Sequence, residues 1–119
     1  MQVSSQQMNR NISRQIFKML FSILADTRNI REVEEMFADL LTDSERMAIA
    51  KRLAIGVYLD KGRSYENIKE NLKVSSATIA AVAESMGNPG MQRAINMIKA
   101  EEWAAVWTDK IMRLVGKMR

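Results

Sequence analysis

From Ile12 onward, apolar residues recur every three or four positions, which is the spacing of amphipathic α-helices. Residues 1–11 lack this period and are rich in Gln, Ser and Asn, so we expect a flexible N-terminal arm there. We expect residues 12–119 to form a single helical domain. The first helix should end near Thr27, and its apolar stripe consists of Ile12, Ile16, Phe17, Met19, Leu20, Ile23 and Leu24.

Two further helices follow before the middle of the chain. The second has an apolar stripe made of Ile30, Val33, Met36, Phe37, Leu40 and Leu41. The third should begin at Thr42-Asp43-Ser44-Glu45, a capping-box pattern in which Thr42 and Glu45 each bond the other's backbone N–H. Lys61-Gly62 predicts its end, with the glycine in the left-handed conformation. Its expected buried face consists of Met47, Ile49, Ala50, Leu53, Ala54, Val57 and Tyr58.

Residues 64–86 have the spacing of a helix-turn-helix. Ser64 and Ser75 are each placed to cap a short helix. Two short helices joined by so small a turn are typical of this motif. Its expected buried residues are Ile68, Leu72, Val74, Ile79 and Val82.

A C-terminal helical extension is predicted over residues 88–118. Asn88 should cap it, with Pro89 at the first helical position, where the missing N–H costs little. Trp103 and Trp107 are four residues apart and therefore share one face. We interpret them as anchors of a core or a subunit interface, because a base-stacking platform needs basic neighbours and theirs are acidic.

The composition narrows the class of protein. One Pro and few aromatic residues in 119 argue against a β fold, so we expect an all-α fold of about six helices. The chain has no Cys and no His, which excludes disulfides, thiolate nucleophiles and histidine-based catalysis. A Ser–Lys pair or an all-carboxylate Mg²⁺ site is still open to this composition, but the sequence arranges neither with suitable spacing. We therefore expect no enzyme, no catalytic residue, no metal site and no cofactor.

The position of the charges along the chain is more informative about a binding surface than the net charge of +4. Residues 51–73 hold six bases and three acids, so the basic excess lies in the central third of the chain. Apolar stretches are far shorter than the roughly 20 residues of a membrane helix. We expect a cytoplasmic protein with no membrane partner.

The second helix of the motif is the predicted DNA-reading element, because the major groove of DNA admits an α-helix. Arg63, Lys69 and Lys73, on or beside the first helix of the motif, are placed to hold phosphates. The second helix lacks Arg, Lys, Asn and Gln, the side chains best suited to bidentate base contacts. Its outward positions are Ser75, Ser76, Ala77, Thr78, Ala80 and Ala81.

Four runs of residues resemble the Trp repressor superfamily, and within it the YerC/YecD-like branch. The resemblance covers about residues 33–86 and implies an all-helical, intertwined homodimer that presents two helix-turn-helix motifs to a palindromic operator. The runs are Leu40-Leu41-Thr42-Asp43-Ser44-Glu45-Arg46, Lys51-Arg52-Leu53, Tyr58-Leu59-Asp60-Lys61-Gly62-Arg63-Ser64-Tyr65 and Ser75-Ser76-Ala77-Thr78-Ile79.

By this resemblance, Lys69, Ala77 and Thr78 occupy DNA-contacting positions. Glu66 departs from the family pattern, because the Trp repressor has a DNA-contacting Arg there. That departure leaves the operator sequence open.

The resemblance also implies a candidate effector pocket at Thr42, Arg52 and Ser85. Ala81 replaces the repressor's Arg that engages the ligand, so tryptophan is not the expected effector. A helix cap for Thr42 and an ion pair for Arg52 are the structural alternatives.

Two functions fit these observations. The first is a sequence-specific, DNA-binding transcriptional regulator that acts as a homodimer on double-stranded DNA and does not depend on tryptophan. The alternative is a helical interaction or dimerisation module whose DNA-reading helix has degenerated, because that helix is rich in alanine. Binding to duplex DNA at low salt separates the two.

Overall fold

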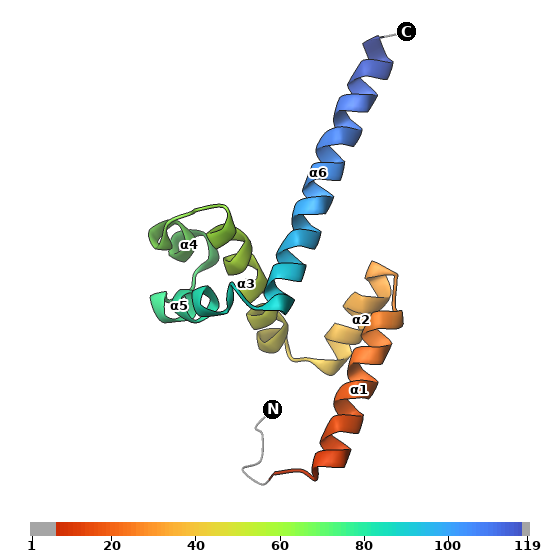
Figure 1. Ribbon diagram of the computed structural model, residues 1–119, viewed down its shortest axis with the longest axis vertical. Helices are drawn as coiled ribbons and strands as arrows, with labels where there is room; N and C mark the ends of the chain where they lie inside the picture. The colour runs from red at the N-terminus through yellow and green to blue at the C-terminus, as the bar shows by residue number, and fades with distance from the viewer. Residues whose placement is uncertain (1–6, 118–119) are drawn as a thin grey trace. The chain divides into compact units, whose positions relative to one another are not determined.

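The structure is a computed structural model that describes residues 7–117, and these residues form six α-helices without a strand (Figure 1). This confirms the predicted all-α class. Residues 1–6 of the expected N-terminal arm lie outside the described residues. The described chain divides into two compact units, one ending at Arg46 and the other beginning at Met47.

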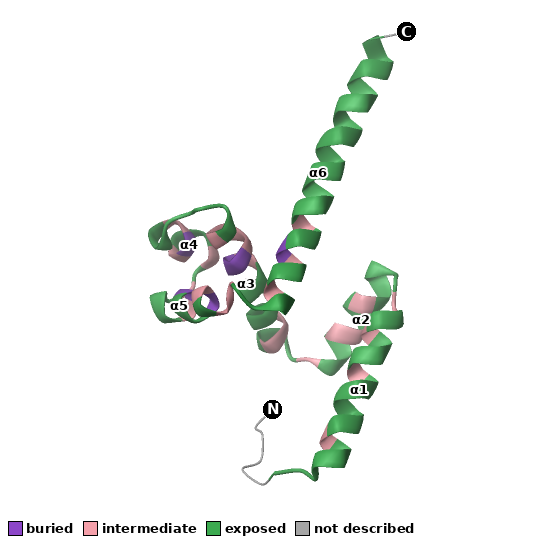
Figure 2. Ribbon diagram, in the orientation of Figure 1, coloured by how far each residue is buried: buried purple, intermediate pink, exposed green. Residues whose placement is uncertain are grey.

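The first unit contains α1 (Arg10–Asp26), α2 (Ile30–Leu40) and the first turn of α3 (Asp43–Asp60). The side chain of Asn9 accepts from the N–H of Asn11, so α1 begins two residues before the expected apolar stripe. Asn29 caps α2 in the same way. Neither helix has a buried residue, although both carry large apolar side chains (Figure 2).

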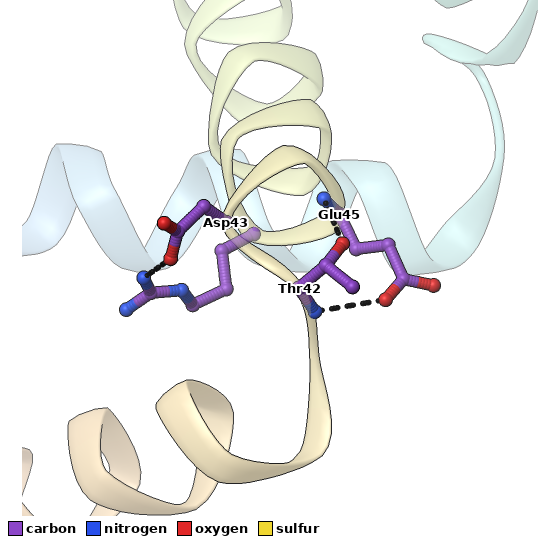
Figure 3. Close-up of polar contacts among 4 residues, drawn as sticks. Thr42, Asp43 and Glu45 are labelled. Carbon is purple, nitrogen blue, oxygen red and sulfur yellow. Dashed lines mark hydrogen bonds and ion pairs between the residues drawn. The ribbon is translucent and has the colours of Figure 1, made fainter. Parts of the chain in front are cut away.

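The predicted capping box forms at the start of α3 (Figure 3). The N–H of Thr42 donates to Glu45 Oε1 at 2.8 Å, and the N–H of Glu45 donates to Thr42 Oγ1 at 3.1 Å. The backbone and hydroxyl hydrogen bonds to Thr42 lower the pKa of the Glu45 carboxyl below its ordinary value. Asp43 forms an ion pair with Arg46 beside the box.

The end of α3 is also as predicted. Gly62 has a φ of 76°, in the left-handed region that glycine enters without a steric penalty. Its N–H donates to the Leu59 carbonyl at 3.0 Å, and the N–H of Arg63 donates to the Tyr58 carbonyl at 3.1 Å. These two bonds are those of a Schellman motif, which stops the helix and turns the chain toward the next one.

The helix-turn-helix consists of α4 (Tyr65–Leu72) and α5 (Ser76–Ser85). Ser64 Oγ accepts from the N–H of Asn67 at 3.1 Å, and Ser75 Oγ accepts from the N–H of Thr78 at 3.2 Å, so both predicted caps are confirmed. Between the helices, Lys73 has a φ of 54°. This left-handed residue ends α4 and lets the chain reverse within three residues.

The core of the second unit joins three helices. Ile55 of α3, Ile68 of α4 and Ile79 of α5 are each 0% exposed, and Val82 packs with them (Figure 2). The predicted buried residues of the motif are therefore confirmed at these positions, while Leu72 and Val74 pack partly buried against the cluster.

The expected buried face of α3 is wrong in part. Met47, Ile49, Ala50 and Leu53 are exposed, whereas Ile55 and Gly56 are buried. Because α3 carries apolar residues on every side, its periodicity does not select the face that packs against the motif.

The last helix, α6 (Pro89–Lys117), begins at the expected proline and is continuous over 29 residues. Its first turns pack on α3 at Gly56, where an added Cβ would lie 3.0 Å from Met91 Sδ and 3.6 Å from Ile95 Cδ1. Glycine at this position therefore permits a close approach of the two helices. Ion pairs from Lys61 to Glu102, at 3.1 Å, and from Lys99 to Asp60, at 2.9 Å, extend the contact.

Candidate nucleic-acid interface

The helix α5 has one buried face and one exposed face. Ile79 and Val82 anchor it in the core. Because α5 turns by about 100° per residue, the positions between these anchors are directed to the opposite side. Five of the six predicted DNA-reading positions are exposed and Thr78 is half-buried; the exposed ones are Ser75, Ser76, Ala77, Ala80 and Ala81.

The hydroxyl groups of this face differ in the hydrogen bonds that they make within the protein. Ser75 Oγ lies 3.0 Å from Thr78 Oγ1 and also accepts the N–H of Thr78. These two side chains therefore hold the first turn of α5. Ser76, which is exposed in the same turn, is the hydroxyl better placed to contact a base edge.

The predicted phosphate-binding residues lie along α4 and its two ends. Arg63 Nη1 donates to Asn67 Oδ1 at 3.2 Å, and its guanidinium lies 4.5 Å from the centroid of the Tyr58 ring. The ring and the amide hold this cation in place ahead of α4. Lys69 is half-buried on α4, and Lys73 is exposed at the turn between the helices.

A further cation, contributed by α3, lies at the same turn. Lys51 Nζ donates to the Lys73 carbonyl at 3.3 Å. Sequence reasoning counted Lys51 in the basic excess but did not assign it to this site, because the bond joins residues 22 positions apart. Its ammonium bonds the carbonyl of the left-handed residue and adds positive charge beside it.

The motif, taken together with Arg63 before it, carries no net charge. Residues 63–85 contain three bases, Arg63, Lys69 and Lys73, and three acids, Glu66, Glu70 and Glu84. Positive potential near α5 therefore depends on neighbouring cations of α3 such as Lys51 and Arg52.

A hollow of about 450 Å³ lies beside the exposed face of α5. Arg52 and Ser85, two of the three predicted effector residues, line it together, and Ser85 Oγ donates to the Val82 carbonyl at 2.8 Å. Thr42 belongs to the first unit, where it caps α3. The remaining lining residues are Ala77, Thr78, Ala81, Val82 and Met91.

Met91 was not predicted as a lining residue. It comes from the first turn of α6, and only the packing of α6 on α3 brings it to the hollow. No helix within residues 7–117 combines the length and the hydropathy needed to cross a bilayer.

Comparisons with known proteins agree with the resemblance seen in the sequence. A family model described as Trp repressor protein matches residues 15–100, from within α1 to the middle of α6. A Bacillus subtilis (strain 168) protein named "Uncharacterized protein YerC" is 29% identical over 85 residues, which cover 70% of this chain and 82% of that protein. No solved structure gives a significant match.

Proposed function

Because the chain belongs to the Trp repressor protein family, we propose that it is a sequence-specific DNA-binding transcriptional regulator that inserts α5 into the major groove. The observation that carries this proposal is the capped helix-turn-helix whose second helix is anchored by Ile79 and Val82 and exposes its other face. A helix held in this way offers its N-terminal side chains to base edges as a rigid element.

The exposed side chains define how bases are read. Ser76 hydrogen-bonds a base edge, while the methyl groups of Ala77 and Ala80 contact thymine methyl groups. Lacking a bidentate side chain, α5 discriminates less per base pair than an Arg–guanine contact does, and DNA shape contributes to the choice of operator.

Phosphate contacts come from Arg63, Lys69 and Lys73. Each neutralised phosphate changes the slope of log affinity against log salt by about −0.9, so one motif gives a slope of about −3. The slope is modest because each motif offers only three cations to phosphate, and a dimer with two motifs doubles it.

The active form is proposed to be an intertwined homodimer. The apolar stripes of α1 and α2 have no buried residue within the described chain, and side chains such as Phe17 and Ile30 are 53% and 77% exposed. Two copies that interlace these helices bury both stripes in one shared core, which completes the single helical domain expected over residues 12–119. A two-fold dimer then reads a palindromic operator.

The hollow beside α5 is a candidate effector site that does not take tryptophan. Arg52 supplies a cation and Ser85 a hydroxyl. Ala81 provides no charge where the Trp repressor clamps its ligand with an Arg. We place the protein in the cytoplasm with its DNA, as a regulator and not an enzyme.

The deciding experiment is selection from a pool of randomised duplexes at low and at physiological salt, followed by sequencing of the retained DNA. Enrichment of a palindrome is the expected result, and its half-site spacing gives the distance between the two α5 helices. Lys69→Gln should weaken binding to every sequence, whereas Ser76→Ala should change the preferred sequence. Lys110→Gln, which removes the same charge from the far end of α6, is the matched control and should leave binding unchanged.

A helical interaction module is the second candidate. The exposed Ala77, Ala80 and Ala81 make a smooth surface on which another helix can pack, and the motif together with Arg63 is electrically neutral. No duplex binding at either salt concentration would favour this module over the regulator.

A further inference from the structure

The turn between α4 and α5 is built around a lysine in an unusual backbone conformation. Lys73 has a φ of 54°, and among the described residues it is the one residue other than glycine with a positive φ. The left-handed region crowds the Cβ of every residue except glycine, so such a residue persists where its surroundings hold it in place. The contacts of Lys73 therefore show what fixes this turn.

The motif itself holds the backbone on both sides of Lys73. The N–H of Lys73 donates to the Lys69 carbonyl at 2.9 Å, which closes the last turn of α4. Its neighbours in the chain, Leu72 and Val74, pack partly buried against the core. These contacts leave the Lys73 carbonyl without a partner from the motif, because no backbone N–H within residues 7–117 donates to it.

The missing partner of this carbonyl comes from α3. Lys51 Nζ donates to it at 3.3 Å. Lys51 lies one turn before Ile55, which is 0% exposed in the core, so its half-buried stem follows the contact that α3 makes with the motif. Within the described chain, no carboxylate forms an ion pair with Lys51. The Lys73 carbonyl is therefore the polar contact that orients this ammonium.

A positive charge is favourable at this place. A helix carries a partial negative charge at its C-terminus, and a cation there is stabilising. Lysine side chains near the end of a helix hydrogen-bond its last carbonyls. Lys51 makes such a bond at the end of α4 from another helix, so one side chain ties α3 to the turn that leads into α5.

We propose that Lys51 is a positioning residue for the DNA-reading helix, because it holds the left-handed turn from which α5 begins. The consequence for DNA binding rests on the proposed function, whereas the hold on the turn does not. Ser75, two residues after Lys73, caps α5, and Ser76 is the hydroxyl proposed to contact a base edge. A change of backbone angle at Lys73 therefore displaces this hydroxyl relative to α4 and its phosphate-binding side chains.

Hydrogen exchange in the absence of DNA tests the hold on the turn. Lys51→Met keeps an unbranched stem and removes the ammonium. We expect the N–H groups of Lys73 and Thr78 to exchange about 2- to 10-fold faster, which is the size of one lost hydrogen bond. The N–H of Ile55, in the core, should exchange as in the wild type. Lys51→Arg restores a cationic donor and should return the exchange toward the wild-type rate.

The control for this experiment removes the same charge elsewhere. Lys110 lies on the last turns of α6, where Trp103 and Trp107 are 65% and 46% exposed, and Lys110→Met should leave exchange at the turn unchanged. Unchanged exchange at Lys73 in Lys51→Met would overturn the proposal. Equal acceleration at Ile55 would overturn it too, because the side chain then supports the whole core and not the turn. A Lys51→Arg chain that exchanges like Lys51→Met would show that the donor is not what holds the turn.

Binding to the duplex that the wild type selects tests the consequence for DNA. Lys51→Met should weaken binding about 2- to 10-fold for each motif, and Lys51→Arg should restore it. The slope of log affinity against log salt should change less than in Lys73→Gln, which removes a phosphate contact and about one unit of slope for each motif. An equal loss of slope in Lys51→Met and Lys73→Gln would mean that Lys51 contacts phosphate itself, which contradicts a positioning role.

Failure of the proposed function is distinguishable from failure of this role. A wild type that binds no duplex removes the proposed function, whereas exchange at the turn is measured without DNA and still decides whether Lys51 holds it. A wild type that binds duplex, together with a Lys51→Met variant that binds equally well, overturns the positioning role alone.

Discussion

The two units of the chain carry similar apolar side chains, but only the second unit buries them completely. In the second unit, three isoleucines from α3, α4 and α5 are completely buried, so the helix-turn-helix closes its own core. In the first unit, α1 and α2 carry equally apolar stripes and have no buried residue. The difference shows that the helix-turn-helix closes its core within its own unit, whereas the apolar stripes of α1 and α2 stay exposed in theirs.

The largest effect should come from the closed core. Ile68→Ala removes a side chain that is 0% exposed and leaves a cavity, so we expect a loss of about 2–5 kcal/mol in the free energy of unfolding. Urea denaturation followed by circular dichroism measures it. Met97→Ala, at a side chain of α6 that is 63% exposed, is the control and should change the free energy by less than about 0.5 kcal/mol. Similar losses for both would contradict a core closed around Ile68.

A charge introduced into the exposed apolar stripe of α1 tests whether this stripe mediates association of two copies. Phe17→Glu places a carboxylate on the exposed stripe of α1, where the ring of Phe17 lies 5.9 Å from that of Phe21. We expect the dissociation constant of the proposed dimer to rise about 100-fold or more, because about 1.5–3 kcal/mol of apolar burial is lost in each copy. Sedimentation velocity measures the change. Gln15→Glu on the polar side of α1 should leave association intact, and a monomeric wild type would remove the basis of this prediction.

A smaller effect separates stability from binding within the motif. Lys73 has a φ of 54°, so Lys73→Gly should relieve left-handed strain and raise the free energy of unfolding by about 0.5–1 kcal/mol. The same change should weaken DNA binding and reduce the salt slope by about one for each motif, which is about two for the proposed dimer. Thermal unfolding and binding titrations across salt concentrations measure the two effects. Unchanged binding would remove Lys73 from the phosphate-contacting set.

The smallest effect concerns pH and the capping box. Because its bonds to Thr42 lower the folded-state pKa of Glu45, the carboxylate stabilises α3 fully above the ordinary glutamate pKa of about 4.3. This stabilisation is lost as the pH falls through the lowered value. Glu45→Gln should remove that part of the pH dependence, measured as the melting temperature between neutral and acidic pH. An identical acid profile in the variant would contradict the role of the carboxylate.

Local signals in the sequence predicted much of this fold. The capping box at Thr42, the glycine stop at Gly62 and the serine caps at Ser64 and Ser75 all depend on residues within a few positions of each other. Such signals do not depend on tertiary packing, so they can be recognised in a single sequence.

Features that depend on contacts between distant residues could not be predicted in this way. The buried face of α3 was wrong because α3 is apolar on all sides, and its contact with the motif selects Ile55. Met91 reaches the hollow, and Lys51 reaches the turn of the motif, only through contacts distant in sequence. The DNA-contacting roles of residues such as Lys69 and Ser76 stay predictions.

The separation of α5 into an anchored face and an exposed face also bears on how the specificity of the protein can evolve. Ala77, Ala80 and Ala81 are exposed while Ile79 and Val82 hold the helix. Replacing an exposed alanine by Arg or Gln costs little in helix propensity and needs no compensating change in the core. Under the proposed function, a new operator preference is therefore accessible through single substitutions that leave the fold unchanged.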